Sequence, residues 1–530
     1  MKHLISALGF FLFFSSFPIL AQPNIQWQKC LGGTGNDEGA ESIRQTSDGG
    51  YIVAGRTNST DGDVSGFHGI RDFWITKLDA SGNLSWQKSL GGSNDEFAKS
   101  VDLTSDGGYI VAGPTRSNDG NVSGNKGGQD FWLVRLNPAG DLLWQKCLGG
   151  PNTDFPHSVR HTSDGGFIVA GFTDSNSGDV SGYHGGQFDW WVVKLDASGN
   201  IVWQKCFGGS AEEKAYAIEQ TSDGGYIASG FTASNDQNVS GNNGGMDYWV
   251  VKMDAAGNLT WQDCFGGYVP GVGNWGEHAY SVKPTSDGGY IVGGFACNNN
   301  GDISGNHNPA KVRDFWLVRL NSSGNMLWQK CLGGADHDYC WSIIATTDGG
   351  FMAAGSSYSI DGDVTGNHGE VQETEDAWIV KVNAEGNMVW QKCLGGTEDD
   401  SFSEIRPTAD GGFIAAGVSQ SVDGDVTGLH GFQDFWVVKL SADPTEIQPF
   451  SSKAELLRIS PNPSAGNFLL QADASLTGKN CRVYNSTGQL VLEYKISQTA
   501  FSISLENQPS GIYSIGVEGE AGAALRVIRE

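Results

Sequence analysis

The chain alternates short β-rich runs with Gly- and Asp-rich turns, and this pattern returns about every sixty residues. In the second copy, apolar runs at 100–104, 109–113, 131–136 and 142–148 are separated by two short turns and one long polar loop. Short runs bounded by Gly and Asp predict β-strands joined as hairpins. The third and fourth runs are apolar at nearly every residue, which indicates packing on both faces.

Three sequence markers set the number of copies at seven. The first is the Asp of an S/T/A-D-G-G-Y/F turn, at Asp48, Asp106, Asp164, Asp223, Asp287, Asp348 and Asp410. The second is the Trp of W-Q-K/D, at Trp27, Trp86, Trp144, Trp203, Trp261, Trp328 and Trp390. The third is a Trp that closely follows an Asp, at Trp74, Trp132, Trp191, Trp249, Trp316, Trp378 and Trp436. Repeats of this length, rich in Gly and Trp, are typical of propellers and solenoids.

The phase of the repeat favours a closed ring. The chain opens with a W-Q-K run at Trp27 and ends its last copy after the D-F-W run at Trp436. The connection from Leu78 to Leu84 is too short to cross a sheet, so D-F-W and W-Q-K runs are hairpin partners. We therefore predict an all-β fold: a seven-bladed β-propeller over residues 22–440, closed by its N-terminal strand, which removes the exposed edge of an open stack.

Residues 1–21 have a short basic start, an apolar core and a small residue, Ala21, before Gln22. This pattern predicts a secretory signal peptide. No later segment is apolar enough to span a bilayer. The net charge of −27 argues against a nucleic-acid partner, since phosphate binding needs a basic surface. We expect a protein that is secreted or held at the outer cell surface after removal of the signal peptide, with no transmembrane segment.

Six of the nine cysteines share one repeat position, three residues after the Trp of the W-Q-K/D run: Cys30, Cys147, Cys206, Cys264, Cys331 and Cys393. Equivalent positions on the outermost strands of neighbouring blades lie too far apart for a disulfide, whose Cα atoms must be within roughly 7 Å. We expect buried thiols there. Pairing of Cys297 with Cys340 stays open, and Cys481 stands alone in another domain.

The repeat stops after Leu440. Residues 441–455, with Pro444 and Pro449, are predicted to be a linker, and residues 456–530 a small C-terminal antiparallel β-sandwich with turns at 461–466, 486–488 and 509–511.

The C-terminal segment carries P-N-P-x-x-G, V-Y-N-x-x-G-Q-L-V and P-S-G-I-Y, followed by a basic R-V-I-R-E end. In this it resembles the type A C-terminal sorting domain of the type IX secretion system of Gram-negative bacteria. The resemblance implies outer-membrane passage through that secretion machinery, removal of the tail, and release or surface attachment. The usual Lys near the end is Arg526 or Arg529 here. The matching positions are Pro461, Asn462, Pro463, Gly466, Gly488, Gly511 and Tyr513.

The repeats also resemble a bacterial β-propeller group of the SBBP type, on residues Leu90–Asp95 and Asp106–Thr115. That resemblance implies an architecture but no activity.

The long loop between the second and third runs carries oxygen-bearing side chains at positions 1, 3, 5 and 12 around a Gly at position 6, a spacing that suits calcium. Four copies have it: Asp61, Asp63, Ser65 and Asp72; Asp119, Asn121, Ser123 and Asp130; Asp236, Asn238, Ser240 and Asp247; and Asp423, Asp425, Thr427 and Asp434. The sequence predicts calcium in one or more of these loops, and no other cofactor. The alternative is a set of Asx-type turns, in which the last Asp binds backbone amides.

Five histidines share one position of that loop: His68, His184, His307, His368 and His430. In different blades these side chains point away from one another, so a hydrogen bond within each loop is expected rather than a metal cluster.

Function on a repeat scaffold tends to lie where the copies diverge. The loop after Trp261 is expanded, and the equivalent loop of the next copy is rich in aromatic residues. Aromatic rings beside polar groups suit sugar stacking or a protein hot spot, although the same rings could fill a wider gap between blades. The candidate binding residues are Tyr268, Trp275, Glu277, His278, His337, Tyr339 and Trp341.

These patterns favour a secreted or surface-displayed propeller that acts as a binding or scaffold module for a glycan or a protein. No catalytic residue is singled out by spacing. The alternative is an extracellular polysaccharide-active enzyme, a hydrolase or lyase, which acidic side chains converging on the channel mouth would favour.

Overall fold

The computed structural model describes residues 22–35, 39–268, 276–308, 312–369, 373–444, 457–460, 464–473, 476–485, 489–517 and 524–529. The chain divides into two compact units, Met1–Thr445 and Glu446–Glu530. Every named element of the described residues is a β-strand. Within those residues no helix is long and apolar enough to cross a membrane. The predicted signal peptide and most of the predicted linker lie outside the described residues.

The described strands of residues 22–444 form seven four-stranded sheets with antiparallel pairing. The first three are β2 (Ala40–Gln45), β3 (Tyr51–Thr57), β4 (Asp72–Leu78) and β5 (Leu84–Leu90); β6 (Ser100–Leu103), β7 (Tyr109–Thr115), β8 (Asp130–Leu136) and β9 (Leu142–Leu148); and β10 (Asp154–His161), β11 (Phe167–Thr173), β12 (Asp189–Leu195) and β13 (Ile201–Phe207). The next three are β14 (Glu213–Gln220), β15 (Tyr226–Thr232), β16 (Asp247–Met253) and β17 (Leu259–Phe265); β18 (His278–Pro284), β19 (Tyr290–Ala296), β20 (Asp314–Leu320) and β21 (Met326–Leu332); and β22 (Asp338–Ala345), β23 (Phe351–Ser357), β24 (Asp376–Val382) and β25 (Met388–Leu394).

The seventh sheet joins the two ends of this unit. Its strands are β26 (Asp400–Pro407), β27 (Phe413–Ser419), β28 (Asp434–Leu440) and β1 (Ile25–Leu31), and β1 pairs antiparallel with β28 at the sheet edge. The register places Trp27 opposite Lys439 and Cys30 opposite Trp436. The same third-to-fourth strand pairing occurs in the other six sheets, but there both strands come from consecutive chain.

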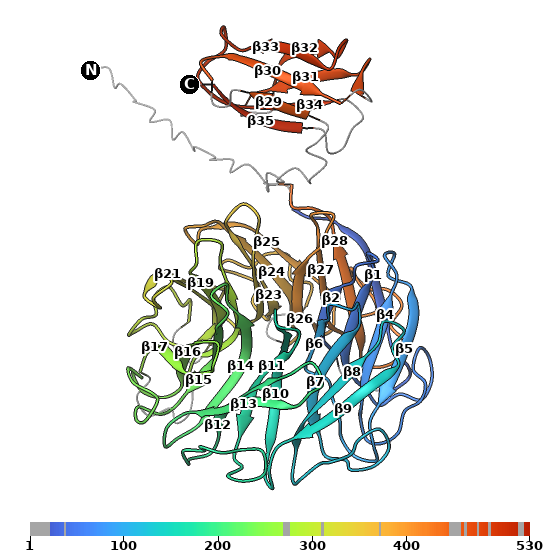
Figure 1. Cartoon of the computed structure of the whole chain (residues 1–530), viewed down its shortest axis with the longest axis vertical. Coiled ribbons are helices and arrows are strands. Elements are labelled where there is room, and N and C mark those ends of the chain that lie inside the picture. The colour runs from blue at the N-terminus through green and yellow to red at the C-terminus, as the bar shows by residue number, and fades with distance from the viewer. Residues whose placement is uncertain are drawn as a thin grey trace, which may run out of the picture. The chain divides into compact units, whose positions relative to one another are not determined.

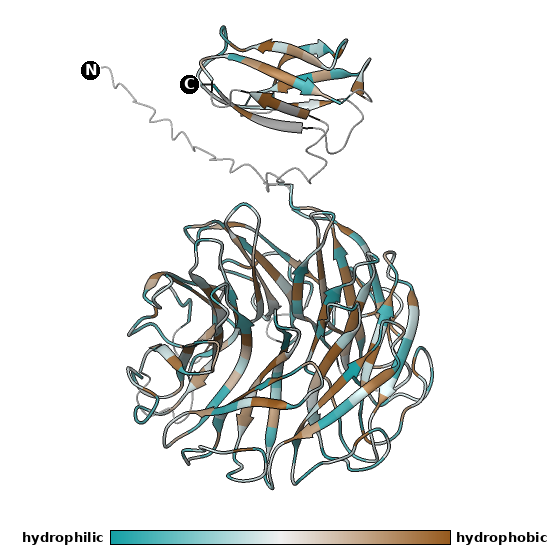
Figure 2. Ribbon diagram, in the orientation of Figure 1, coloured by the Kyte–Doolittle hydropathy of each residue, from teal (hydrophilic) through white to brown (hydrophobic). Residues whose placement is uncertain are grey.

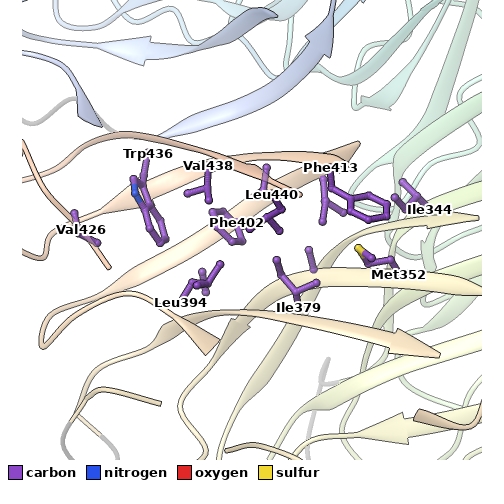
Figure 3. Close-up of a cluster of buried hydrophobic side chains, with 14 of the residues drawn as sticks. Ile344, Met352, Ile379, Leu394, Phe402, Phe413, Val426, Trp436, Val438 and Leu440 are labelled. Carbon is purple, nitrogen blue, oxygen red and sulfur yellow. The ribbon is translucent and has the colours of Figure 1, made fainter. Parts of the chain in front are cut away.

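The hydrophobic cores of this unit lie between sheets. Seven clusters of buried side chains each join one sheet to the next, and one of them, with Leu31, Val53 and Val437, joins the last sheet to the first. Figure 1 shows the sheets arranged around a common centre, with β2, β6 and β10 toward the middle. Hydrophobic colours gather on the strands and hydrophilic ones on the connecting loops (Figure 2). One cluster, between the sheets of β22–β25 and β26–β28, is drawn in Figure 3.

Burial differs between the third and fourth strands of each sheet. Every residue of β4, β8 and β12 is buried, as the continuous apolar pattern predicts. The prediction that the fourth strand is packed on both faces is wrong for its first half, where Leu143 and Val202 are 55% and 60% exposed. That strand is outermost and has a hydrogen-bonded neighbour on one side alone.

The S/T/A-D-G-G-Y/F turns are held by one repeated arrangement, shown here for the second copy. The Asp106 carboxylate accepts hydrogen bonds from the Thr104 hydroxyl at 2.6 Å and from the Gly108 amide at 3.2 Å. It also accepts two from the Arg135 guanidinium of β8, at 2.6 and 2.7 Å. These contacts lower the pKa of Asp106 to about 2. Because Gly107 has a φ of +82° and a Cβ on Gly108 would lie 2.3 Å from the Leu136 carbonyl oxygen, both glycines are required. The first marker is therefore structural.

All nine cysteines are free thiols, and all except Cys206 are buried. Burial raises the pKa of Cys30 and Cys147 to about 12, so these thiols stay protonated and unreactive. The prediction of small buried thiols is confirmed. Cys297 and Cys340, whose pairing the sequence left open, are not joined.

The C-terminal unit holds two sheets that share one core. One consists of β29 (Leu457–Ser460), β30 (Asn467–Ala472) and β33 (Ala500–Ser504); the other of β31 (Asn480–Tyr484), β32 (Leu490–Lys495), β34 (Gly511–Val517) and β35 (Ala524–Arg529). Cys481 and Tyr513 are buried there, and the Tyr513 hydroxyl donates to the Pro509 carbonyl oxygen at 2.6 Å. Gly466 has a φ of +125°, which only glycine adopts readily. Pro461, Asn462, Pro463 and Gly488 lie outside the described residues.

Candidate functional site

A cavity of about 360 Å³ lies where the first strands of all seven sheets meet, and we call it the axial cup. Its lining comes from β2, β10, β14, β18, β22 and β26, from Lys99 and Ser100 at the start of β6, and from Glu375 just before β24. Consecutive residues of a first strand reach the cup, as Tyr216 and Ala217 do, because the strand pairing has a register shift between Ala215 and Ala217. The cup therefore combines a position that differs among the copies with a neighbouring position that is Ser or Ala in six of the seven sheets.

One side of the cup is a continuous row of rings, the aromatic row, made of His157, Tyr216, Tyr280 and Trp341 from four neighbouring sheets. Ring centroids are 4.8 Å apart for His157 and Tyr216, and the Tyr216 and Tyr280 rings stack at 4.4 Å. Tyr280 meets Trp341 edge-on at 4.5 Å. The four residues are half-buried, so their rings contact one another and the cavity. Tyr216 and Tyr280 turn one face toward each other, so the wall offers a ligand an apolar aromatic surface together with the polar hydroxyl and ring N–H edges of its members.

A second set of rings supports the aromatic row. His278 stacks on Phe231 at 4.4 Å, and Tyr339 stacks on Trp341 at 5.5 Å with 6° between the planes. His337 in turn stacks on Tyr339 at 5.8 Å. Four of the residues predicted to bind ligand thus belong to one array: His278, His337, Tyr339 and Trp341.

The other predicted binding residues lie elsewhere. Glu277 is fully buried, accepts a hydrogen bond from Asn298 Nδ2 at 2.7 Å, and is the equivalent of Glu96 and Glu213, which bind loop amides and hydroxyls in their own sheets. Burial, reinforced by Asp247, raises the pKa of Glu277 to about 8. Tyr268 is 54% exposed and does not line the cup, and Trp275 lies outside the described residues.

The side of the cup opposite the aromatic row is polar. Ser401 and Ser403 stand where other copies carry rings, and Glu41 accepts a hydrogen bond from Lys99 Nζ at 2.6 Å. Glu375, from the sheet that carries Trp341, also lines the cup, and burial, together with the charges of Asp399 and Asp400, raises its pKa to about 7. The cup therefore combines an aromatic wall with a wall of hydroxyls and carboxyls.

The base of the cup is crossed by ion pairs that we call the basal ring. Arg44 pairs with Asp102 at 3.1 Å and with Glu404 at 2.7 Å, and Arg406 Nε donates to Glu404 at 2.9 Å. On the facing side, Arg160 pairs with Glu219 at 3.0 Å, and Lys283 donates to the same carboxylate. The basal ring consists of Arg44, Asp102, Arg160, Glu219, Lys283, Glu404 and Arg406.

Burial shifts the titration of several groups around the cup. The pKa of His157 is held well below its usual range by burial and by the Lys99 and Lys214 cations, so its imidazole is neutral. Burial and the Arg406 cation lower the pKa of Lys283 to about 7, although Glu219 opposes this shift. The pKa values of Glu219 and Glu404 lie far below the usual range, because the arginines and Lys283 outweigh burial.

The predicted calcium side chains engage different neighbours. In the first copy the Asp61 carboxylate accepts hydrogen bonds from the Thr34 amide and hydroxyl, both at 2.7 Å, while the Ser65 hydroxyl accepts one from Gln87. Asp72 accepts from the His68 amide and ring nitrogen, at 3.0 and 2.8 Å. The part of the chain that the structure describes contains no group of three or more His, Cys, Asp or Glu side chains placed to hold a metal ion. Calcium stays a prediction, and calorimetry on the chelator-treated chain would test it.

The loop histidines make the expected hydrogen bond. In each of the five copies, Nδ1 lies 2.7 or 2.8 Å from an oxygen of the Asp that begins the third strand. His68, His184, His307, His368 and His430 therefore orient buried carboxylates one by one and form no common cluster.

We expect the chelator-treated chain to be more stable at pH 5 than at pH 7.5. Burial is the main cause that raises the pKa of Asp130 and Asp400 to about 6 and that of Asp247 to about 7, and nearby carboxylates add to it. At these carboxyls the folded state binds more protons than the unfolded state between about pH 4 and 7, and stability is lost as pH rises through that range, while the lowered pKa values of the buried His157 and His278 oppose part of this change. The expected gain is about 1 kcal/mol per carboxyl, measured by urea unfolding.

The Asp247→Asn variant imitates the protonated form and should reduce this pH dependence. The exposed turn residue Asp254 supplies the control, because its pKa is lowered by the Asn258 amide and side chain and it titrates below this range. An unchanged slope in Asp247→Asn, or an equal loss of slope in Asp254→Asn, would contradict the assignment.

Comparison with known proteins assigns the tail. Residues 458–528 match the family of the secretion system C-terminal sorting domain. Regulatory protein FlaEY of Caulobacter vibrioides is 24% identical over 274 residues, 48% of this chain, and the match spans 28% of that relative's length. Similar solved structures include the Neurospora crassa Pan2 WD40 domain, with a TM-score of 0.42 and 10% identity over 79% of this chain and 97% of that one. PorZ, a surface component of the type IX secretion system of Porphyromonas gingivalis, has a TM-score of 0.19 and 10% identity over 91% of this chain and 73% of that one.

Residues 458–528 are therefore a type IX secretion system C-terminal sorting domain, which indicates export to the cell surface or beyond and an interaction with the secretion machinery.

Proposed function

We propose that this protein is a secreted or surface-displayed binding module whose axial cup takes a carbohydrate against the aromatic row. One observation carries the proposal: His157, Tyr216, Tyr280 and Trp341 form an unbroken row of rings along one side of a 360 Å³ cavity. Aromatic side chains suit the apolar patches of sugars, and the rest of the lining supplies Ser401, Ser403 and Glu375 for hydroxyl groups.

The architecture that presents this cup is, in this proposal, a seven-bladed propeller closed by β1. Its support is the pairing of β1 with β28 and the buried cluster that joins the last sheet to the first. Cleavage after residue 21 and the relation of the repeats to the SBBP type are parts of the same proposal.

Replacing Tyr280 or Trp341 by alanine should weaken polysaccharide binding by about 30-fold, since each removes a ring of the row worth about 2 kcal/mol. The measurement is retention of the full chain on a polysaccharide array, followed by calorimetry on the best ligand. Tyr268→Ala is the matched control, because Tyr268 is an exposed aromatic residue outside the cup. Equal losses in all three variants, or no loss in Tyr280→Ala, would sink the proposal.

A second candidate function, a polysaccharide-active enzyme, is favoured by the acid–base groups in the same cup. His157 is neutral, Lys283 has a pKa of about 7, and the Tyr216 and Tyr280 residues lie between them around the wall. Release of new reducing ends from a bound polysaccharide, lost in His157→Asn, would favour this candidate over simple binding.

A further inference from the structure

The charge at the base of the axial cup is opposite to that of the chain as a whole. The basal ring holds four cations, Arg44, Arg160, Lys283 and Arg406, but three carboxylates, Asp102, Glu219 and Glu404. The whole chain has a net charge of −27. Lys283 has a pKa of about 7 and is only partly charged at neutral pH, so the excess of positive charge is small in the free protein and would grow when a bound anion stabilises the ammonium form.

Hydrogen-bond donors are also in excess at this place. Among the described residues, Arg44 Nη2 and Ser158 Oγ are buried and have no hydrogen-bond partner, and Ser158 lines the cup. Glu404 is already engaged, because it accepts from Arg44, Arg406, the Ser42 hydroxyl and the Ile43 amide. Unpaired buried donors are costly, so acceptor oxygens from a ligand would be bound favourably.

Two of the four cations, Lys283 and Arg406, are disfavoured by their basic neighbours, whereas the carboxylates around Arg160 raise its pKa. Besides burial, the Arg406 and Arg160 charges lower the pKa of Lys283, and burial and Arg44 lower that of Arg406. The carboxyls of the cup wall compensate this field only in part. Glu41 is neutralised by Lys99, and Glu375 has a pKa raised to about 7, so it is partly protonated at neutral pH.

The base and the aromatic row lie within reach of one ligand. Tyr280 and Lys283 both belong to β18, and His157 and Arg160 both belong to β10, three positions apart in each case. Three residues of a strand span about 10 Å, and the long Lys and Arg side chains shorten that gap. A sugar ring on the aromatic row can therefore direct a charged substituent toward the base.

From this arrangement we infer that the ligand of the axial cup is an acidic carbohydrate, a sugar chain whose carboxylate groups meet Lys283, Arg160 and Ser158 while a sugar ring packs against the aromatic row. The inference rests on the proposed carbohydrate-binding function and adds the ligand class. Charge-assisted hydrogen bonds from guanidinium and ammonium groups to a carboxylate are about twice as strong as neutral ones, so the acid group decides the preference.

The test compares matched ligands on the full chain at low ionic strength: polygalacturonate, alginate and hyaluronate, each beside its methyl-esterified or carboxyl-reduced form. We expect at least one acidic polymer to bind ten times or more tightly than its neutral partner.

Tyr280→Ala should weaken both forms, whereas Lys283→Met should remove the preference and leave the neutral form bound. Because Lys283→Met also leaves Glu219 with one cation fewer, Ser158→Asp is the second variant: it places a carboxylate at the unpaired donor and should also abolish the preference. Thermal unfolding confirms that both variants fold.

The possible outcomes distinguish a wrong ligand class from a wrong binding function. Equal binding of acidic and neutral forms, lost in Tyr280→Ala, would overturn the inference and keep the proposed function. Binding of neither form to the unmodified chain, with no other carbohydrate retained, would overturn both. Displacement of the acidic polymer by polyglutamate at equal carboxylate concentration would overturn the carbohydrate assignment and point to an acidic polypeptide.

Discussion

Replacing Phe402 by alanine should lower the free energy of unfolding by about 3–5 kcal/mol, and replacing Ala377 by phenylalanine in the same chain should restore most of it. The reason lies in how neighbouring sheets meet. At six of the seven junctions, the aromatic residue after the first Asp of a third strand packs against the Trp of the next sheet at 4.4–4.5 Å. These pairs are Phe73–Trp132, Phe131–Trp191, Trp190–Trp249, Tyr248–Trp316, Phe315–Trp378 and Phe435–Trp74.

At the remaining junction, the ring that packs against the Trp comes from a first strand instead of a third strand. Ala377 stands where the other copies carry a ring, and Phe402 of β26 stacks on Trp436 at 5.0 Å with 16° between the planes (Figure 3). Phe402 is itself the exception at its own position, where the other six sheets carry Ala40, Ala98, Pro156, Ala215, Ala279 and Cys340. The two departures from the repeat therefore compensate each other in space.

A double-mutant cycle measures this compensation by urea unfolding. Ala377→Phe alone should destabilise by about 1–3 kcal/mol, because the space is already filled. The double variant should then be far more stable than the sum of the single effects allows. Phe435→Ala is the control: it should cost as much as Phe402→Ala, and Ala377→Phe should not rescue it. Additive effects of Ala377→Phe and Phe402→Ala would show that the two side chains do not share one space.

The repeat can be predicted from the sequence because each marker has a local structural cause. The D-G-G turn needs an Asp between a Thr and a Gly, and the third-strand Trp is held by a Gln thirteen residues later, as in Trp132 Nε1 donating to Gln145 Oε1 at 2.9 Å. These partners recur at fixed spacing, so pattern alone reveals them. The loop carboxylates of the predicted calcium sites behave differently, since Asp61 binds Thr34, twenty-seven residues earlier on another sheet.

The residues of the axial cup could be predicted from the sequence only in part. The sequence predicted Tyr339 and Trp341 to lie in a loop, which is wrong, because both belong to β22; they drew notice as an aromatic cluster, whereas Tyr216 and Tyr280 look like ordinary β residues. A signal was present, because one first-strand position differs in nearly every copy, while the residue after it is Ser or Ala in six copies and Glu404 in the seventh. That position is Glu41, Lys99, His157, Tyr216, Tyr280, Trp341 and Ser403 in turn. Glu277 was predicted to bind a ligand, but aligning the copies shows that it is a structural carboxyl that recurs in the repeat.

Deleting residues 22–31 should destabilise the first unit by about 5 kcal/mol or more, comparable with the whole stability of an ordinary domain. The deletion removes β1, so β28 loses its partner strand. It also uncovers two cores at once, since Cys30 belongs to the cluster between the sixth and seventh sheets and Leu31 to the cluster between the seventh and first. We expect loss of soluble protein or a large drop in the midpoint of thermal unfolding.

A rearranged chain distinguishes loss of ring closure from loss of ten residues. Residues 25–31 are moved behind Leu440 and joined to it by the turn 79–83, which links β4 to β5 in the first sheet. The seventh sheet then regains its fourth strand from consecutive chain, as in the other six. Equilibrium stability should return to most of its original value, but unfolding should be faster, because the two ends of the unit are no longer held in one sheet. Full stability of the simple deletion would show that β1 does not close the ring, and failure of the rearranged chain to fold would show that the first strand acts by more than filling this edge.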